Sequence, residues 1–489
     1  MDEPDRRSDA EVQTSMKTIW LSPRESKAIE KVVQHNDFND VVSVVRQIGY
    51  SPRDFFVGGN CRGLDFRGSD LKNVSFTDAF LDYATFFEDQ LQSVKRSNPR
   101  SMEDLVVVER PITAELQENE SVDPQEYDEA NHLKLRDYIV SEFESERNYI
   151  ALTRKNFPWL DSIPAEIELF ETKDNIRIDL SGTHIKDLSP LSRLNKLEEL
   201  NLDETPVRDL NPLRELHSLK KLTLNSTMIK DLEPLRRLDS LRFLSIQNTQ
   251  VSDLQPIGGL SGVTELKVSD CPIKDISAIG GYSNLESLNM ANTPVSEFGT
   301  LAKLKNLRTL NVSLTSFFNV SLISELSCLE RFTATVCPIN DLGPLSTLQQ
   351  LKYLELMSTR VHDLSPISEF IKLEYLDITN TNVSDLTGLI GLENLRQLLI
   401  DKTTVSDLRP LSNLRELEVL SANETAVSDI SPLRELRYIK RLFLVESPVT
   451  DLTALGSHKK LRTLIMSGHE DLDTKPIMPL RDLKFTAIE

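Results

Sequence analysis

The most regular feature of the chain is an alternation of apolar and polar positions that repeats every 22 residues. Within one unit, positions 1, 4 and 6 are apolar and a polar residue separates positions 4 and 6, which is the alternation of a short strand with one buried side. Positions 11, 14, 17 and 20 are mostly aliphatic, and position 16 is often Pro. Because Pro disfavours an α-helix in this return segment, the pattern predicts short 3-10 or extended segments there.

The repeat runs through most of the chain without an insertion or deletion. The first positions of its regular units are Leu197, Leu219, Leu241, Val263, Leu285, Leu307, Leu329, Leu351, Leu373, Leu395, Leu417, Ile439 and Leu461. A degenerate unit begins at Asn175 and a truncated one at Leu483, which gives 14 coils over residues 175 to 482. A fixed period of this length predicts a solenoid. With strands stacked ~4.8 Å apart, its sheet would be on the order of 65 Å long.

Two polar positions recur inside the units. Position 9 is Thr in ten coils, Cys271 and Cys337 in two, and Ser447 and His469 in the others. We expect its side chain to turn inward and to form a hydrogen bond with the backbone of the next coil, because buried polar groups need partners.

Position 13 is Asp in 12 of 14 coils, with Glu297 and Asn319 as the exceptions. We expect each Asp to accept backbone N–H bonds in the turn that starts the return segment. The alternative is a calcium array, which would need several oxygens around one ion.

The consensus L-x-x-L-x-L-x-x-T-x-V-x-D-L-x-P-L-x-x-L resembles the leucine-rich repeat, in the 22-residue class found in bacterial internalins, with Thr where that family usually has Asn. The resemblance implies an α/β repeat solenoid: a curved horseshoe of about 14 coils with a parallel sheet on its concave side. It also implies that a protein partner is recognised on that sheet.

The N-terminal third follows other patterns. Residues 1–20 are expected to be disordered, and residues 21–50 to form a helical hairpin that starts at the Ser22–Pro23 cap and ends at Gly49. In residues 51–92 an apolar residue recurs every five positions from Phe56 to Leu91, and RGSDLKNVSFTDAFLDYATF resembles the pentapeptide repeat. This resemblance implies a two-coil right-handed β-helix, which we expect to pack on the helices before it.

The segments between this module and the repeats differ in charge and pattern. Residues 88 to 129 hold 12 acidic and 4 basic residues, so residues 93–128 are predicted to be an acidic linker. Residues 129–174 are predicted to be a helical N-terminal cap, with a helix over 129–152 and with Phe157 and Trp159 covering the first coil. The solenoid then occupies residues 175–489 and ends in a last strand around Thr486.

The net charge of the chain limits which classes of partner it can bind. The balance of 56 basic and 76 acidic residues gives a net charge of −20, which disfavours binding to nucleic acid or to anionic membranes. Mimicry of DNA by the pentapeptide-like segment is disfavoured because two coils are too short.

The four cysteines form no C-x-x-C pair, and no segment reaches the ~18 apolar residues of a membrane helix. We therefore expect a cytoplasmic protein with reduced thiols, although internalins are exported. The alternative is an effector that a bacterium delivers into a host cell.

The sequence contains no motif of a known catalytic or cofactor site. It has no phosphate-binding loop, no H-E-x-x-H and no G-x-S-x-G, and its seven histidines are scattered singly. Some bacterial effectors join leucine-rich repeats to a cysteine-dependent ubiquitin ligase, for which Cys328 and Cys61 would be the nucleophiles to test. No cysteine lies in the helical segment 92–174, so this resemblance does not extend to catalysis. We expect no enzymatic activity, no cofactor and no metal.

The candidate partner site lies on the predicted concave sheet, where the side chains at positions 3, 5 and 7 would stand. Apolar and aromatic residues gather at these positions in the C-terminal coils: Tyr353, Met357, Tyr375, Leu399, Val419, Phe443, Val445 and Ile465. Since parallel strands place equivalent positions side by side, we expect a contiguous exposed patch, and such patches mark interaction sites. Two alternatives stay open: isolated exposed apolar residues are ordinary, and the LVVV segment of the linker could fold back onto the patch.

Two coils depart from the consensus, over residues 285 to 328. Position 13 is Glu297 and then Asn319, and Phe317 and Phe318 enter the second turn. We expect loss of turn capping here, with a break in curvature or a protruding turn at residues 315 to 323.

Overall fold

The computed structural model describes residues 85–87, 106–108, 124–144, 148–157, 159–467, 472–480 and 482–488. The chain divides into two compact units, Met1–Tyr127 and Asp128–Glu489. In the first unit, strand β1 (Thr85–Phe87) pairs in parallel with β2 (Val106–Val108). The segment predicted to be a linker thus contains a strand. The expectations for residues 1–20 and 21–50, and most of those for the pentapeptide-like module, fall outside the described residues.

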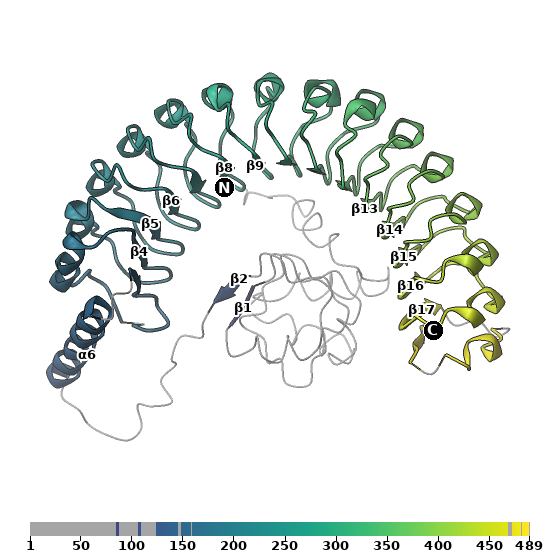
Figure 1. The fold of residues 1–489 in the computed structure, drawn as a ribbon, viewed down its shortest axis with the longest axis horizontal. Helices are drawn as coiled ribbons and strands as arrows, with labels where there is room; N and C mark the ends of the chain where they lie inside the picture. The colour runs from purple at the N-terminus through teal and green to yellow at the C-terminus, as the bar shows by residue number, and fades with distance from the viewer. Residues whose placement is uncertain are drawn as a thin grey trace, which may run out of the picture. The chain divides into compact units, whose positions relative to one another are not determined.

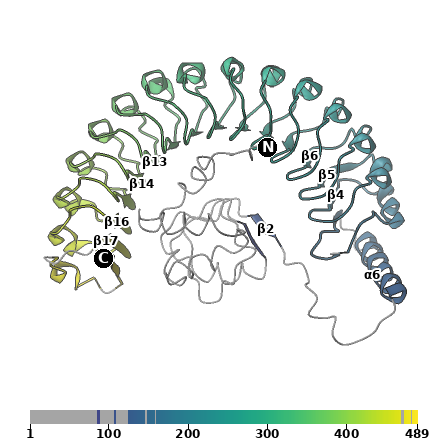
Figure 2. The same ribbon diagram turned by 180° about the vertical axis from the view of Figure 1, so that it is seen from behind.

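The second unit is built on one parallel sheet of 16 strands in chain order (Figures 1 and 2). Its strands are β3 (Tyr149–Ala151), β4 (Ile176–Asp179), β5 (Leu197–Asn201), β6 (Lys221–Thr223), β7 (Phe243–Ser245), β8 (Glu265–Lys267), β9 (Ser287–Asn289), β10 (Thr309–Asn311), β11 (Arg331–Thr333), β12 (Tyr353–Glu355), β13 (Tyr375–Asp377), β14 (Gln397–Leu399), β15 (Val419–Ser421), β16 (Arg441–Leu444), β17 (Thr463–Ser467) and β18 (Lys484–Ile488). Strands β4 to β17 are the 14 predicted coils. The predicted solenoid and its last strand are confirmed.

The return segments are 3-10 helices, as the prolines predicted. They are η1 (Ala165–Thr172), η2 (Ser189–Arg193), η3 (Asn211–Leu213), η4 (Glu233–Leu235), η5 (Gln255–Ile257), η6 (Ser277–Gly281), η7 (Gly299–Lys303), η8 (Val320–Ile323), η9 (Gly343–Thr347), η10 (Ser365–Ile367), η11 (Thr387–Leu389), η12 (Arg409–Leu411), η13 (Ser431–Glu435), η14 (Thr453–Ser457) and η15 (Lys475–Ile477). Pro stands in the first turn of many of them, where its fixed φ fits and its missing N–H has no partner to lose.

The N-terminal cap combines a helix with a strand. Helix α6 spans Pro124–Glu144, but the predicted helix over 129–152 is wrong for residues 149–151, which form β3. The reason is tertiary: β3 pairs with β4, and Ile150 is fully buried where it extends the interior of the coils. Phe157 and Trp159 pack edge to face with ring centroids 5.9 Å apart, and both contact the end of the core, as predicted.

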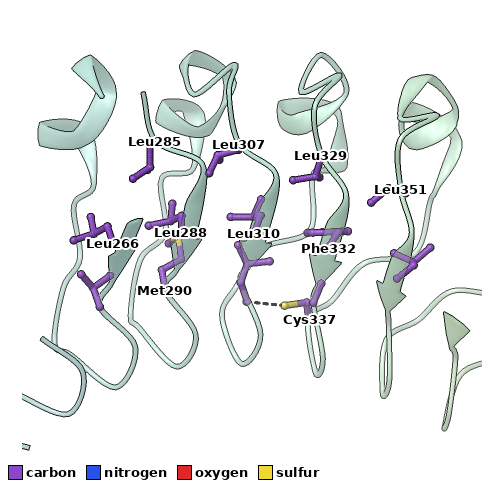
Figure 3. Packing of buried hydrophobic residues seen from close by; sticks show 14 of the residues in the cluster. Leu266, Leu285, Leu288, Met290, Leu307, Leu310, Leu329, Phe332, Cys337 and Leu351 are labelled. Atoms are coloured by element: carbon purple, nitrogen blue, oxygen red, sulfur yellow. Dashed lines mark hydrogen bonds between the residues drawn. The ribbon is translucent and has the colours of Figure 1, made fainter. Parts of the chain in front are cut away.

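The interior consists of rows of equivalent side chains from successive coils. Leu266, Leu288 and Leu310, all at position 4, have no exposed surface and lie in line (Figure 3). Burying one such side chain stabilises the fold by about 1.5–3 kcal/mol. Because every coil adds the same row members, the core grows with the number of coils.

The inward hydroxyls at position 9 form a different bond from the one predicted. In all ten coils with Thr, Oγ1 donates to the position 6 carbonyl of the same coil, as Thr359 does to Leu356 at 2.7 Å. The expected bond to the next coil is therefore wrong. Three of the exceptions bond to the preceding coil instead, and the fourth, His469, lies outside the described residues. Cys337 Sγ donates to the Val312 carbonyl at 3.1 Å (Figure 3). Cys271 and Ser447 do the same.

The aspartates at position 13 cap the return segments, as predicted. Each accepts the backbone N–H two residues on, at 2.7–3.0 Å: Asp187, Asp209, Asp231, Asp253, Asp275, Asp341, Asp363, Asp385, Asp407, Asp429, Asp451 and Asp473. Hydrogen bonds from that second residue lower the pKa of several of these carboxyls, Asp363 and Asp429 among them. The ladder is thus a structural device of the turns.

The irregular coils keep the strand register of their neighbours. Asn319 retains the cap, because its Oδ1 accepts the Ser321 N–H at 3.2 Å, and β10 pairs in register with β9 and β11. Phe317 fills the interior and packs edge to face on Phe298, with ring centroids 5.1 Å apart. The predicted loss of capping is wrong at Asn319, and Phe318, which lies in the turn predicted to protrude, is 64% exposed.

Position 8 of the coils is a left-handed turn that the sequence pattern did not predict. Its residues have φ between 51° and 69°: Gly182, Glu204, Ser226, Asn248, Asp270, Asn292, Leu314, Val336, Ser358, Asn380, Lys402, Glu424 and Glu446. The turn aims the backbone N–H at the next coil, as when Asn248 donates to the Ser269 carbonyl at 3.0 Å. Leu314 and Val336 are poorly suited to this conformation, which a β-branched residue tolerates least. Both side chains are substantially exposed, so burial offsets little of the strain.

Replacing Val336 with Asn should therefore stabilise the protein. Asn occupies the same turn at Asn248, Asn292 and Asn380, and relief of a strained φ is worth about 1 kcal/mol. Chemical denaturation of Val336→Asn measures the gain. The reciprocal variant Asn380→Val should lose at least as much, because it also removes the hydrogen bond from Asn380 Nδ2 to Ser358 Oγ at 2.9 Å. Equal stability of both variants with the wild type would contradict the strain.

The capping aspartates predict a pH dependence. A carboxyl whose folded-state pKa is lowered adds stability above its ordinary pKa of 3.8, and that stability disappears as the pH falls through the folded value. Asn keeps the acceptor but cannot titrate, as Asn319 shows. The free energy of unfolding of Asp363→Asn/Asp429→Asn should therefore approach or exceed that of the wild type as the pH falls from about 5 to about 3. Parallel curves for the two proteins would exclude this role.

Candidate functional site

The concave face of the second unit presents the side chains that flank the buried strand position. Figure 1 shows the strands along the inner side of the arc and the 3-10 helices along its outer side. In β13, Leu376 has no exposed surface and points into the coil. Since side chains alternate along a strand, Tyr375 and Asp377 stand on the opposite, concave side.

A stack of planar groups crosses three neighbouring strands on this face. Tyr353 and Tyr375 are direct partners in the register of β12 and β13. Their ring centroids are 4.1 Å apart with an interplanar angle of 5°. The guanidinium of Arg331 lies 3.9 Å from the centroid of the Tyr353 ring, and the Tyr353 hydroxyl donates to Glu355 at 2.7 Å. Arg331, Tyr353 and Tyr375 form what we call the planar stack.

The other predicted site residues lie on the same face but are less contiguous than expected. Gln397 stands between Tyr375 and Val419 in the register of position 3, and Ser421 stands between Leu399 and Phe443 at position 5. Phe443 and Ile465 are direct neighbours. The structure thus separates the predicted patch into smaller groups.

The predicted site residues are also less exposed than a free sheet face would suggest. Met357, Tyr375, Leu399, Val419 and Phe443 are buried, and Tyr353, Val445 and Ile465 are half-buried. One physical reason is visible in the planar stack, where flat groups on adjacent strands cover each other. These side chains are therefore less exposed than the predicted patch requires, and strand alternation places them on the concave face.

A polar system on the concave face escaped the sequence prediction. The backbone N–H at position 7 of many coils is bound by a side-chain acceptor. In five coils the acceptor is position 5 of the same coil: Asp179, Asn201, Asn289, Asn311 and Asp377. In five others it is position 7 of the preceding coil: Asp203, Asn225, Ser313, Asp401 and Asn423. The recurrence of Asn and Asp at positions 5 and 7 was the available signal.

Burial in this polar system shifts two carboxyls. Burial raises the pKa of Asp203, and it raises the pKa of Asp401 well above the ordinary value. Each nevertheless accepts the N–H of the equivalent residue on the next coil, Asn225 or Asn423. Their role in the structure is to satisfy the backbone.

Two of the four cysteines, Cys271 and Cys337, lie in the interior of the coils. Burial raises the pKa of the Cys271 and Cys337 thiols, which keeps them protonated and poorly nucleophilic. Cys328 is half-buried, and Cys61 lies outside the described residues. Within the described ranges, no three His, Cys, Asp or Glu side chains gather as a metal site would require. In that same part of the chain, no helix is long and apolar enough to cross a membrane.

Comparisons with known proteins agree with this architecture. A family model described as leucine-rich repeats (2 copies) matches residues 217–262. An internalin from Listeria monocytogenes superposes with a TM-score of 0.53 and 25% identity, covering 65% of this chain and 87% of that chain. A leucine-rich-repeat protein of Leptospira interrogans gives 0.61 and 17%, covering 71% and 98%. A plant peptide hormone receptor in complex with RGF2 gives 0.55 and 14%, covering 85% and 63%.

No curated protein matches the sequence. The second unit is therefore an internalin-like leucine-rich-repeat solenoid in its fold and its repeat pattern.

The polar system predicts a stability effect at Asn225. Its Oδ1 accepts from the Gln247 N–H at 2.9 Å and from the Ser245 hydroxyl at 2.6 Å. Asn225→Ala leaves both donors without this acceptor, which should cost about 1–3 kcal/mol in unfolding free energy. Asn225→Ser keeps a hydroxyl acceptor, as Ser313 does at the same position of its coil, and should lose less. If Ser proves as harmful as Ala in a denaturant titration, the acceptor role is wrong.

Proposed function

We propose that this protein is a recognition module that binds another protein on its concave sheet, with the planar stack as an anchor. The main observation in support of this proposal is the stacking of the Tyr353 ring on the Tyr375 ring, with the Arg331 guanidinium over the Tyr353 ring as well. Tyr and Arg are the residue types that most often dominate binding energy at protein interfaces.

The planar stack is suited to this task because it is already ordered. A side chain held by its neighbours loses little conformational freedom when a partner docks, so more of the contact energy appears as affinity. The sheet beneath it is rigid, since each strand is bonded on both sides. A partner would contact the edges of the rings and the side chains around them.

The similar structures support recognition as the use of such a sheet. The plant receptor was solved in complex with RGF2, so a solenoid of this fold can carry a binding partner.

The chain would act as a scaffold, sensor or adaptor without catalysis of its own. The proposal places it in the bacterial cytoplasm, with delivery into a host cell as the second possibility. A tagged protein followed by fractionation of culture medium, bacteria and host cells separates the two.

The planar stack predicts a separation of binding from folding. Tyr353→Leu/Tyr375→Leu should lower partner affinity by ~2 kcal/mol or more, while leucine keeps much of the apolar contact of the buried Tyr375 and the half-buried Tyr353, so stability should fall by only about 1 kcal/mol. Leu376→Ala instead opens a cavity inside the coil and should cost ~2–5 kcal/mol of stability. Thermal unfolding measures stability, and affinity purification with quantitative mass spectrometry measures the proteins retained by each variant.

Tyr438→Leu is the matched control, because Tyr438 is a 43% exposed tyrosine outside the strands, stacked with Lys460. It should retain the same partners as the wild type. Full capture by the double tyrosine variant would remove the planar stack from the binding site. Early melting of that variant, like that of Leu376→Ala, would make the rings structural.

A further inference from the structure

A row of charges crosses the coils at position 2, just before each strand. The row reads Glu198, Lys220, Arg242, Thr264, Glu286, Arg308, Glu330, Lys352, Glu374, Arg396, Glu418, Lys440 and Arg462. From Glu286 to Lys440 the sign alternates at every coil. Neighbours form ion pairs at 2.7 Å between Arg308 and Glu330, between Lys352 and Glu330, and between Lys440 and Glu418. The row is a ladder in which most charges pair with a charge of the adjacent coil.

The ladder is interrupted at Arg242. Its neighbours in the row are Lys220, which pairs with Glu198 at 2.6 Å, and the neutral Thr264. Arg242 Nη1 donates to the Asp239 carbonyl at 3.0 Å and to the Leu241 carbonyl at 2.9 Å. Among the described residues, no carboxylate forms an ion pair with this guanidinium. A surface groove lies here, lined by Arg242, Gly262, Thr264, Asn284, Glu286 and Arg308, among others.

The repeat contains its own comparison for this site, at Arg462. Arg462 also stands at position 2, and its Nη1 donates in the same way to the Lys459 carbonyl at 2.9 Å and to the Leu461 carbonyl at 3.3 Å. Its Nη2 lies 3.5 Å from Oδ2 of Asp482, the residue twenty positions after Arg462. The same arginine geometry therefore accepts a carboxylate on its outer side.

At Arg242 the residue twenty positions on is Gly262, which has no side chain to offer. A Cβ built on Gly262 would come within 2.2 Å of Arg242 Nη1, so the guanidinium lies where a side chain would begin. Glu286 is the next acidic residue of the ladder after Arg242, and its Oε2 already lies 3.7 Å from Arg308 Nε. The place that Asp482 takes beside Arg462 is thus not filled by the equivalent residue beside Arg242.

We propose that Arg242 binds a carboxylate from an acidic segment of a partner protein, in the place that Asp482 occupies beside Arg462. The bond would be a charge-assisted N–H···O contact from an arginine with donors to spare. It would give Arg242 the opposite charge that the neutral Thr264 of the next coil does not supply. The site precedes the strands and uses no residue of the planar stack, so it is independent of the concave site.

A labelled acidic peptide tests this site. Fluorescein-labelled hexaglutamate is titrated with the full chain at low salt, because exposed ion pairs are screened by salt, and fluorescence anisotropy reports binding. Arg242→Gln should weaken binding about three- to fivefold, as expected for one exposed pair. Arg462→Gln, already paired within the chain, and Tyr353→Ala should bind as the wild type does. Hexaglutamine should not bind.

Gly262→Asp places a carboxylate at the position that Asp482 holds beside Arg462. Because a Cβ at this position would lie 2.2 Å from Arg242 Nη1, the side chain must displace the guanidinium. The displaced guanidinium should pair with the new carboxylate, and hexaglutamate binding should weaken as much as in Arg242→Gln. Gly262→Asn controls for shape and should weaken binding less. The proposal is overturned if the wild type does not bind hexaglutamate, if Arg242→Gln binds as tightly as the wild type, or if Asp and Asn at position 262 have equal effects.

Discussion

The hydrogen bonds between residues 22 positions apart are the constraint on which the rest of the structure depends. Each strand is only three to five residues long, and it is held by equivalent strands of the coils before and after it. An isolated strand of this length would not be stable. A residue inserted within a strand would move the side chains that follow it in that strand to the other face. The unbroken period therefore keeps equivalent residues paired from β5 to β17.

The same constraint arranges side chains in rows, and each row takes a separate task. The leucine rows form the interior, the position 13 aspartates close the turns, and the acceptors at positions 5 and 7 satisfy backbone donors on the concave side. The charges at position 2 neutralise each other along the start of the strands. Because a row member meets the same position of its neighbours, compatible neighbours matter more than the identity of any one residue.

Departures from a row are therefore informative. Arg242 lacks the acidic neighbour that other cations in its row have, and Gly262 stands where an equivalent coil holds Asp482. Tyr353 and Tyr375 place two rings side by side where most coils have polar residues. Departures do not always signal function, since Phe317 fills the interior in place of an aliphatic residue and Asn319 caps its turn as Asp does.

The sequence by itself determined the elements that depend on contacts within one coil. Strand alternation, proline and the capping aspartates act over a few residues, so the 14 coils, their 3-10 segments and the last strand were predictable. Relations between coils were decided by the tertiary structure. Residues 149–151 became a strand because β4 offered an edge, and the position 9 threonines bonded to their own coil because that carbonyl lay within reach. The concave patch was interrupted by Gln397 and Ser421, and side-chain packing across strands limited its exposure. These outcomes depend on the distances between side chains of neighbouring coils. A repeat pattern is the same for every coil, so it does not specify those individual distances.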